Sequence, residues 1–449
     1  MEKTNNQNIW PCTAKINDNG NLEIAGCDTV ELVEKYGTPL YVYDEETIRE
    51  TCKQYTNAFS KYEKINMFFA SKAFMTKSIC CILASEGFGL DLVSGGEIYT
   101  ALKAGFDMSK TLFNGNNKTI EELELAVDAG VGRISVDNFL ELALLDNLAK
   151  SKNIEIDILL RITPGIECHT HEYIQTGHLD SKFGFDLTQI DEAIERLKEE
   201  YLNLNLKGLH AHIGSQIFET KVYYDEVAVV IEQFALIKDK HNINLEEVNL
   251  GGGLGITYTT EDNPPSIDEI ADTIIRSIDE NTQKFNISKP LIYIEPGRSI
   301  VGTAGVTLYT VGSSKQVPDG KKYIAVDGGM ADNPRPSMYQ AKYTAIVSNK
   351  ADFKPEEKVT IAGRFCESGD IIINDIDLPT TDPGDIICVF NTGAYGYSMS
   401  SNYNRVLKSA AVLVNQGQSD IIIRRETYDE LIANDEIPQR LNLQGVRGL

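Results

Sequence analysis

Apolar runs of strand length alternate with helix-like segments through the central half of the chain. Eight runs follow one another: INMFFASKA, GFGLDLVSG, KTLFNGNN, GRISVDN, IEIDILLRITPG, LKGLHAHIG, EVNLGGG and LIYIEPGR. The segments between them place apolar residues on one face at helical spacing, as Met75, Ile79, Ile82 and Leu83 do. Eight strand–helix alternations over about 250 residues predict a (β/α)8 barrel, with a doubly wound sheet as the alternative.

Two pairs of polar residues mark where helices begin in this region. Thr119 is followed three residues later by Glu122, and Asn138 is followed by Glu141 at the same spacing. In a capping box, each of the two side chains bonds the backbone N–H of the other residue. Both pairs therefore predict a helix that begins at the next residue.

The pattern changes on either side of the predicted barrel. Beyond residue 300, segments such as GVTLYTVGSSKQ and RVLKSAAVLVNQG alternate apolar and polar residues and are separated by Gly, Asp, Pro and Asn. This pattern is typical of a β domain with hairpins. We therefore expect a barrel over residues 40–300, a β domain built from 1–39 and 301–437, and a tail over 438–449 without a clear pattern.

Charge and composition exclude several classes of partner. The 449 residues carry a net charge of -24, which argues against nucleic acid or an anionic membrane as partner. No apolar run has the length of a membrane span, and the polar start lacks the apolar core of a signal peptide. The eight cysteines form no CxxC pair, which favours reduced thiols in a cytoplasmic protein.

Reactive residue types gather at the carboxyl ends of the predicted strands. In a (β/α)8 barrel these ends meet at one mouth, where active sites are built. We therefore expect one shared site. Its candidate residues are Lys72, Asp91, Ser94, Arg161, His212, Ser215, the Gly251–Gly253 run, Glu295, Gly297 and Arg298.

The candidate residues suit a phosphate-bearing aldehyde cofactor. Lys72 could form a Schiff base, whereas the simpler interpretation is a strand-end lysine in solvent. NLGGGLG and EPGR favour phosphate binding over two tight turns, because glycine amides and Arg298 would meet the anion together. Glu295 could hold a pyridine nitrogen protonated. The HTH triplet at 169–171 has poor ligand spacing and no completing residues, so we expect no metal site.

From about residue 38 to 430, the chain resembles the fold-type III pyridoxal-phosphate-dependent decarboxylases. Close members share the ASKAF form of the lysine motif, and Phe365 replaces a residue that is often histidine. The resemblance implies a barrel enzyme that uses pyridoxal 5'-phosphate. The motifs that carry it are ASKAF, GLDLVSGGE, RITPGIECHTHEYIQTGHLDSKFGF, GLHAHIGSQ, NLGGGLG, EPGRSIVG, DGGMADNPRPSMY, GRFCESGD and NTGAYGYSMSSNYN.

The resemblance also implies a role for individual residues. Lys72 would hold the cofactor as a Schiff base, and Cys366 would be the acid that returns a proton after carbon dioxide leaves, with Lys72 as the alternative acid. Cys366 and Glu367 would come from the partner subunit of a homodimer with shared active sites. Further cofactor-binding residues would be Asp91, His212, Ser215, Gly252, Gly253, Glu295, Gly297, Arg298 and Tyr395; substrate-binding residues would be Arg298, Arg335, Tyr339, Glu367 and Tyr395.

The substrate expected from the resemblance is meso-2,6-diaminopimelate, which would give L-lysine and carbon dioxide. Arg335 lies between two prolines and near Tyr339, and this pair suits a carboxylate at the far end of the substrate. Enzymes of the same fold that act on D-ornithine, D-lysine or carboxynorspermidine are the alternatives. A cofactor-free binding homologue and an amino-acid racemase are more distant ones.

Overall fold

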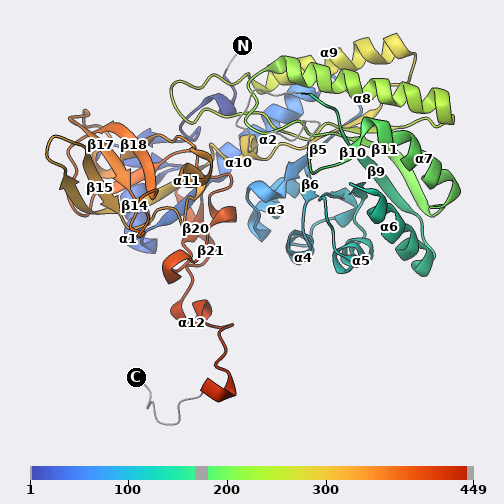
Figure 1. Cartoon of the computed structure of the whole chain (residues 1–449). Helices are drawn as coiled ribbons and strands as arrows, with labels where there is room; N and C mark the ends of the chain where they lie inside the picture. The colour runs from blue at the N-terminus through green and yellow to red at the C-terminus, as the bar shows by residue number, and fades with distance from the viewer. Residues whose placement is uncertain (1–2, 167–180, 442–449) are drawn as a thin grey trace.

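The eight apolar runs form one closed barrel of parallel strands (Figure 1). The computed structural model describes residues 3–166 and 181–441. Each strand pairs with the next, and β13 returns to β5, so the barrel prediction is confirmed and an open doubly wound sheet is excluded. The strands are β5 (Ile65–Ala70), β6 (Gly89–Leu92), β7 (Thr111–Phe113), β8 (Arg133–Val136), β9 (Ile156–Thr163), β11 (Leu204–His210), β12 (Glu247–Asn249) and β13 (Leu291–Ile294).

A ring of helices covers the outside of the barrel. The helix before the first strand, α2, packs between α9 and α3, and so takes the place in the ring that follows β13. A short strand, β10 (Phe185–Asp186), adds to β9. The helices are α2 (Glu45–Phe59), α3 (Lys77–Ser85), α4 (Gly95–Lys103), α5 (Ile120–Ala129), α6 (Phe139–Lys152), α7 (Ile190–Glu199), α8 (Thr220–His241) and α9 (Ile267–Phe285).

The two predicted helix starts differ in how they are capped. Thr119 and Glu122 form the complete reciprocal box at the start of α5. At α6, Asn138 accepts the backbone N–H of Glu141 at 3.1 Å, but the Glu141 carboxylate accepts from Lys118 at 2.6 Å instead of returning the bond. The second helix start is therefore confirmed, whereas its reciprocal bond is replaced by a buried ion pair.

A second sheet lies beside the barrel and forms the β domain (Figure 1). The strand β4 (Leu40–Asp44) pairs with β14 and β20 of this sheet, so the chain crosses into the barrel after Asp44 rather than at the expected residue 40. β4 is buried throughout, as a central strand requires. The other strands are β14 (Gly305–Gln316), β15 (Lys322–Val326), β16 (Ala345–Val347), β17 (Glu357–Ala362), β18 (Ile371–Leu378), β19 (Ile386–Val389), β20 (Ala410–Asn415) and β21 (Gln418–Ile423).

The N-terminal segment packs against the β domain, as the sequence predicts. It forms β1 (Lys15–Ile16), β2 (Leu22–Ile24), β3 (Cys27–Asp28) and α1 (Thr29–Tyr36). Leu22 and Ile24 are buried in one apolar cluster with residues of β4, β14, β19 and β20. Only the start of the segment reaches the barrel, where the Asn6 amide donates to the carbonyls of Gly255 and Pro265 at 3.2 and 2.9 Å.

Two predictions concern residues that the structure does not describe, or describes only in part. The HTH triplet at 169–171 lies outside it, as does most of the predicted tail. The described end of the chain carries α12 (Tyr428–Leu431) and a 3-10 turn (Gln439–Leu441), which extend away from the β domain (Figure 1). Among the described helices, none has the length and apolar character needed to cross a membrane.

Candidate active site

A cavity of about 790 Å³ opens at the barrel mouth and extends to the β domain. Its size is typical of sites for small ligands and cofactors. Asp91 is fully buried and is not part of its lining. The predicted residues that line it together are Lys72, Arg161, His212, Ser215, Gly252, Gly253, Glu295, Gly297, Arg298, Arg335, Tyr339 and Tyr395.

Lys72 lies on a single 3-10 turn (Ser71–Ala73) directly after β5. The β domain fixes this turn, because the backbone N–H of Tyr395 donates to the Ala73 carbonyl at 2.8 Å. The Lys72 side chain is accessible within the cavity, and no described residue forms a hydrogen bond or ion pair with its amine. Burial lowers the pKa of Lys72, but Tyr395, Asp91 and Glu295 outweigh it and raise the pKa. Among the described residues, the amine thus lies near two acids and has no fixed partner.

Two buried carboxyl groups, Asp91 and Glu295, lie close to Lys72. Side-chain amides hold both: Asn249 donates to Glu295 at 2.6 Å, and Asn114 donates to Asp91 at 2.5 Å and to Glu295 at 3.4 Å. Burial, with repulsion from Asp91, raises the pKa of Glu295 to about 8. Burial likewise raises the pKa of Asp91, although Lys72 opposes it. This region, which we call the carboxylate end, favours a cationic group on a bound ligand.

The strand β11 ends in His210, and His212 follows two residues later. The Nδ1 atom of His212 accepts the backbone N–H of Gly252 at 3.3 Å, which holds the ring at the cavity wall. His210 bonds Ser135 at 2.7 Å and lies 3.8 Å from Glu295. Burial lowers the pKa of both histidines well below its ordinary value, and nearby cations add to this effect. A neutral, flat imidazole at the wall suits contact with the face of an aromatic ligand.

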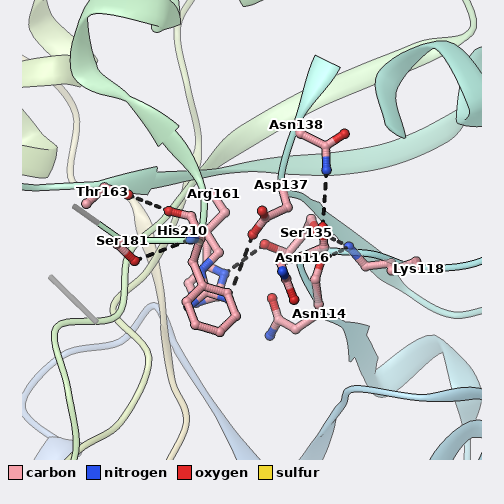
Figure 2. Close-up of polar contacts among 12 residues, drawn as sticks. Asn114, Asn116, Lys118, Ser135, Asp137, Asn138, Arg161, Thr163, Ser181 and His210 are labelled. Carbon is pink, nitrogen blue, oxygen red and sulfur yellow. Dashed lines mark hydrogen bonds and ion pairs between the residues drawn. The ribbon is translucent and has the colours of Figure 1, made fainter. Parts of the chain in front are cut away.

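Figure 2 shows polar side chains at the ends of β7, β8, β9 and β11, which lie around His210. Lys118 is fixed there by Glu141 and by the carbonyls of Ser135 and Gly115, at 2.6, 2.7 and 2.9 Å. Arg161 lies 4.0 Å from Asp137 (Figure 2). All three hydrogens of the Lys118 ammonium are therefore used within the protein, whereas no described residue accepts a hydrogen bond from Lys72.

A second part of the same cavity, which we call the guanidinium end, contains Arg298 and Arg335. Arg298 begins α10 (Arg298–Val301) and donates to Tyr258 at 2.6 Å and to Ser215 at 2.9 Å. Arg335 begins α11 (Arg335–Tyr339) and donates to Tyr258 at 3.0 Å and Tyr343 at 2.7 Å. Both guanidinium groups are buried, and none of the described Asp or Glu side chains forms an ion pair with either. This end favours anionic groups on a ligand.

Glycine is required where the chain passes the guanidinium end. A Cβ atom on Gly252 would lie 2.1 Å from the Glu295 carbonyl oxygen. Gly253 has φ +110°, and a Cβ atom there would lie 2.5 Å from the Gly214 carbonyl oxygen. Side chains at these positions would collide with the backbone, so only glycine lets the run pack this closely while its backbone lines the cavity with Arg298.

Cys366 and Glu367 do not join this cavity within one chain. They lie in the turn between β17 and β18, and both are exposed. The Glu367 carboxylate accepts a hydrogen bond from the Tyr403 hydroxyl. Ser94, another candidate, does not line the cavity either, because its hydroxyl caps α4 by accepting the backbone N–H of Glu97 at 3.3 Å.

Three residues that contact the site groups are not predicted from the sequence: Asn114, Asn249 and Tyr258. Asn114 and Asn249 orient the carboxylates, and both stand at strand ends, where the pattern that selected Asp91 could have found them. Tyr258 follows the glycine run in an irregular segment, and no periodic pattern marks it.

The residues fit pyridoxal phosphate on their own chemistry. Buried atoms without a partner among the described residues include Asp91 Oδ2 and Arg298 Nε, so the site has unused capacity for both a cation and an anion. A free amine, a carboxylate for a ring nitrogen and an arginine beside a glycine run are what this cofactor requires. Fold and site together define a barrel enzyme of the pyridoxal-phosphate class.

Comparison with known proteins agrees with this class. The family described as "Pyridoxal-dependent decarboxylase, pyridoxal binding domain" matches residues 45–302. The diaminopimelate decarboxylase of Bacillus subtilis is 48% identical over 426 residues, 94% of this chain and 97% of that protein. The one from Synechocystis is also 48% identical, over 97% of this chain and 94% of that protein.

Solved structures give the same result. The crystal structure of diaminopimelate decarboxylase from M. jannaschii in co-complex with L-lysine has a TM-score of 0.89 and 37% identity, and the match covers 96% of this chain and 99% of that one. The chain therefore belongs to the diaminopimelate decarboxylase family of pyridoxal-dependent decarboxylases.

Proposed function

We propose that the chain converts meso-2,6-diaminopimelate to L-lysine and carbon dioxide, with pyridoxal phosphate bound through Lys72. The observation that carries the choice of substrate is Arg335, a buried guanidinium that lines the same cavity as Lys72 and has no carboxylate partner among the described residues. An arginine suits a second carboxylate on the substrate, whereas it would repel the distal ammonium of a simple diamino acid.

The carboxylate end would hold the reactive part of the cofactor. When bound, pyridoxal phosphate supplies a protonated ring that accepts the electron pair left by the departing carboxylate. Glu295 would keep the ring nitrogen protonated, and His212 would contact the ring face. Asp91 would favour the charged form of Lys72, since it contributes to the raised pKa of that amine. Lys72 would bind the cofactor and then give way to the amine of the substrate.

The guanidinium end would hold two anions. Arg298 would bind the cofactor phosphate and assist at the substrate carboxylate, while Arg335 and Tyr339 would bind the far carboxylate of the substrate. Exclusion of water from buried arginines strengthens both contacts. Further phosphate contacts would come from Ser215, Gly252, Gly253, Gly297 and Tyr395, and Tyr395 would also contact the substrate.

A second copy of the chain would complete the site. Cys366 and Glu367 are exposed and lie outside the cavity of their own chain, which supports their delivery to a partner in a homodimer. Cys366 would return a proton to the α-carbon, with Lys72 as the alternative acid. Glu367 would pair with the remote ammonium of the substrate.

The test compares substrates for the wild-type protein and Arg335→Ala. Wild type should turn over meso-diaminopimelate faster than D-ornithine, D-lysine or carboxynorspermidine. Loss of the buried partner of a carboxylate costs about 2–5 kcal/mol, so Arg335→Ala should raise KM for meso-diaminopimelate by roughly 30-fold or more. Arg196→Ala, which removes an arginine paired with Glu192 at the surface, is the control. Faster turnover by wild type of a substrate without the far carboxylate would refute the proposal.

A further inference from the structure

One phenolic oxygen joins the two arginines of the guanidinium end. The Tyr258 hydroxyl accepts from Arg298 at 2.6 Å and from Arg335 at 3.0 Å. A phenolic oxygen has two acceptor positions, so the two guanidinium groups fill both. The two cations, which would repel each other alone, are thus held at one oxygen.

This oxygen lies where the two parts of the fold meet. Arg298 begins α10, directly after the last barrel strand, whereas Arg335 begins α11 within the β domain. Tyr258 follows the glycine run of the barrel, but its ring is buried in the apolar cluster of the β domain. It packs edge-on against Tyr343 at 5.2 Å between ring centroids. Tyr258 therefore connects an arginine from each part of the fold.

The backbone around Tyr258 is tied on both sides. The Tyr258 N–H donates to Asp262 at 2.9 Å, and its carbonyl accepts from the Thr344 hydroxyl at 2.9 Å. The adjacent Thr257 carbonyl accepts from the Asn391 amide at 2.9 Å. With these three neighbours fixing the segment and a packed ring, the hydroxyl has little freedom to move, so it can hold the arginines at one separation.

The electrostatics of the phenol agree with this arrangement. Burial raises the pKa of Tyr258, but Arg298 and Arg335 outweigh burial, and the net effect lowers the pKa. The lowered pKa means that both arginines favour negative charge on the shared oxygen. Each guanidinium still has N–H groups beyond those used here, because it carries five donors.

We propose that Tyr258 is a positioning residue that determines substrate length, because it sets the separation between Arg298 and Arg335. The cavity would then select amino acids whose second carboxylate lies at one distance from the cofactor phosphate. This inference rests on the proposed function, which places the phosphate at Arg298 and the far carboxylate at Arg335.

The experiment compares Tyr258→Phe with two matched tyrosine variants. Tyr343→Phe removes a hydroxyl that contacts Arg335 but not Arg298. Tyr224→Phe removes a hydroxyl paired with Glu280 on the outer surface. The measurements are the dissociation constant of pyridoxal phosphate from cofactor-free protein, kcat and KM for meso-diaminopimelate, and the inhibition constant of pimelate, which has both carboxylates and no amines.

Tyr258→Phe keeps the ring and its packing, and should weaken both cofactor binding and pimelate binding by about tenfold, because each arginine loses a hydrogen bond to an oriented oxygen. KM for meso-diaminopimelate should rise by a similar factor while kcat changes little. Tyr343→Phe should weaken pimelate binding alone, and Tyr224→Phe should change neither. In an Arg335→Ala background, Tyr258→Phe should weaken pimelate binding by much less than it does in the wild type, because only the contribution of Arg298 is left.

Three results would overturn the inference: unchanged cofactor and pimelate binding in Tyr258→Phe, a change in only one of them, or additive effects with Arg335→Ala. A melting temperature measured for each variant identifies a general loss of structure, which would lower kcat as well and would also count against a positioning role. Failure of the wild type to turn over meso-diaminopimelate refutes the proposed function instead, because the cofactor and pimelate measurements do not depend on turnover.

Discussion

The carboxylate end and the guanidinium end of the cavity bury charge in opposite ways. At the carboxylate end, Asp91 and Glu295 are held by neutral amides, and burial raises the pKa of both acids. At the guanidinium end, Arg298 and Arg335 are held by hydroxyl groups. An ion pair between the ends would have neutralised both. Instead, among the described residues, amides bond the two acids and no carboxylate pairs with either arginine, so a ligand with a cationic ring and anionic groups can bind at both ends.

Lys72→Ala should break the carboxylate end most severely. The variant removes the only amine that we assign to bond making, so activity should fall by on the order of a thousandfold or more. The measurement is kcat for meso-diaminopimelate with excess pyridoxal phosphate. Lys77→Ala, an exposed lysine at the start of α3, should retain wild-type activity. Comparable loss in both variants would contradict the role of Lys72.

Glu295→Gln tests whether the carboxylate end acts through charge. Glutamine keeps the shape but cannot hold a proton on the ring nitrogen, so kcat should fall by about 100- to 1000-fold. Cofactor absorbance, recorded on the same samples, separates lost binding from lost chemistry. Full activity in Glu295→Gln would show that the charge is not needed.

Mixing the subunits of two inactive variants tests whether the Lys72 and Cys366 of one active site come from different chains. Lys72→Ala and Cys366→Ala should each be inactive alone. If Cys366 acts in the partner's site, mixed dimers contain one intact site, and an equal mixture should recover about one quarter of wild-type activity. The activity of the two variants is measured before and after exchange of subunits. No recovery, despite exchange shown by differently tagged chains, would place Cys366 in its own chain's site, and an active Cys366→Ala alone would place it outside catalysis.

The smallest expected effect is a pH dependence of stability from the carboxylate end. Burial raises the pKa of Glu295 from 4.5 to about 8, so the folded, cofactor-free protein keeps a proton that the unfolded chain releases. The resulting stability is complete below about pH 4.5 and is lost as pH rises toward 8. Between pH 5 and 8 the melting temperature of Glu295→Gln should therefore fall less than that of wild type, by a few degrees.

The matched control for this prediction is Glu200→Gln, which alters an exposed acid after α7 and should leave the wild-type slope unchanged. Equal slopes in wild type and Glu295→Gln would mean that this carboxyl does not carry the raised pKa.

The sequence predicts the carboxylate end better than the guanidinium end, for a physical reason. Lys72, Asp91 and Glu295 stand at ends of barrel strands, and closure of a parallel barrel brings such ends together. Arg335 enters from the β domain, whose packing against the barrel has no periodic signal. Its place in the site was predicted from family resemblance alone, and its role stays a prediction, as do those of Cys366 and Glu367.

Tyr258 and β4 show what local patterns cannot reveal. β4 has the pattern of any buried strand, and only its pairing with β14 and β20 places it in the second sheet. Tyr258 is defined by contacts with residues 40 and 77 positions away, so no spacing in the sequence connects the three side chains.

Chemical trapping of the cofactor tests the central claim most directly. Cofactor-loaded protein is reduced with borohydride and digested, and the modified lysine is identified by mass spectrometry. The account predicts a pyridoxyl group on Lys72, because this amine has no fixed partner among the described residues, and none on Lys118, whose ammonium is held by three acceptors. Modification of Lys118, or of no lysine at the barrel mouth, would contradict it.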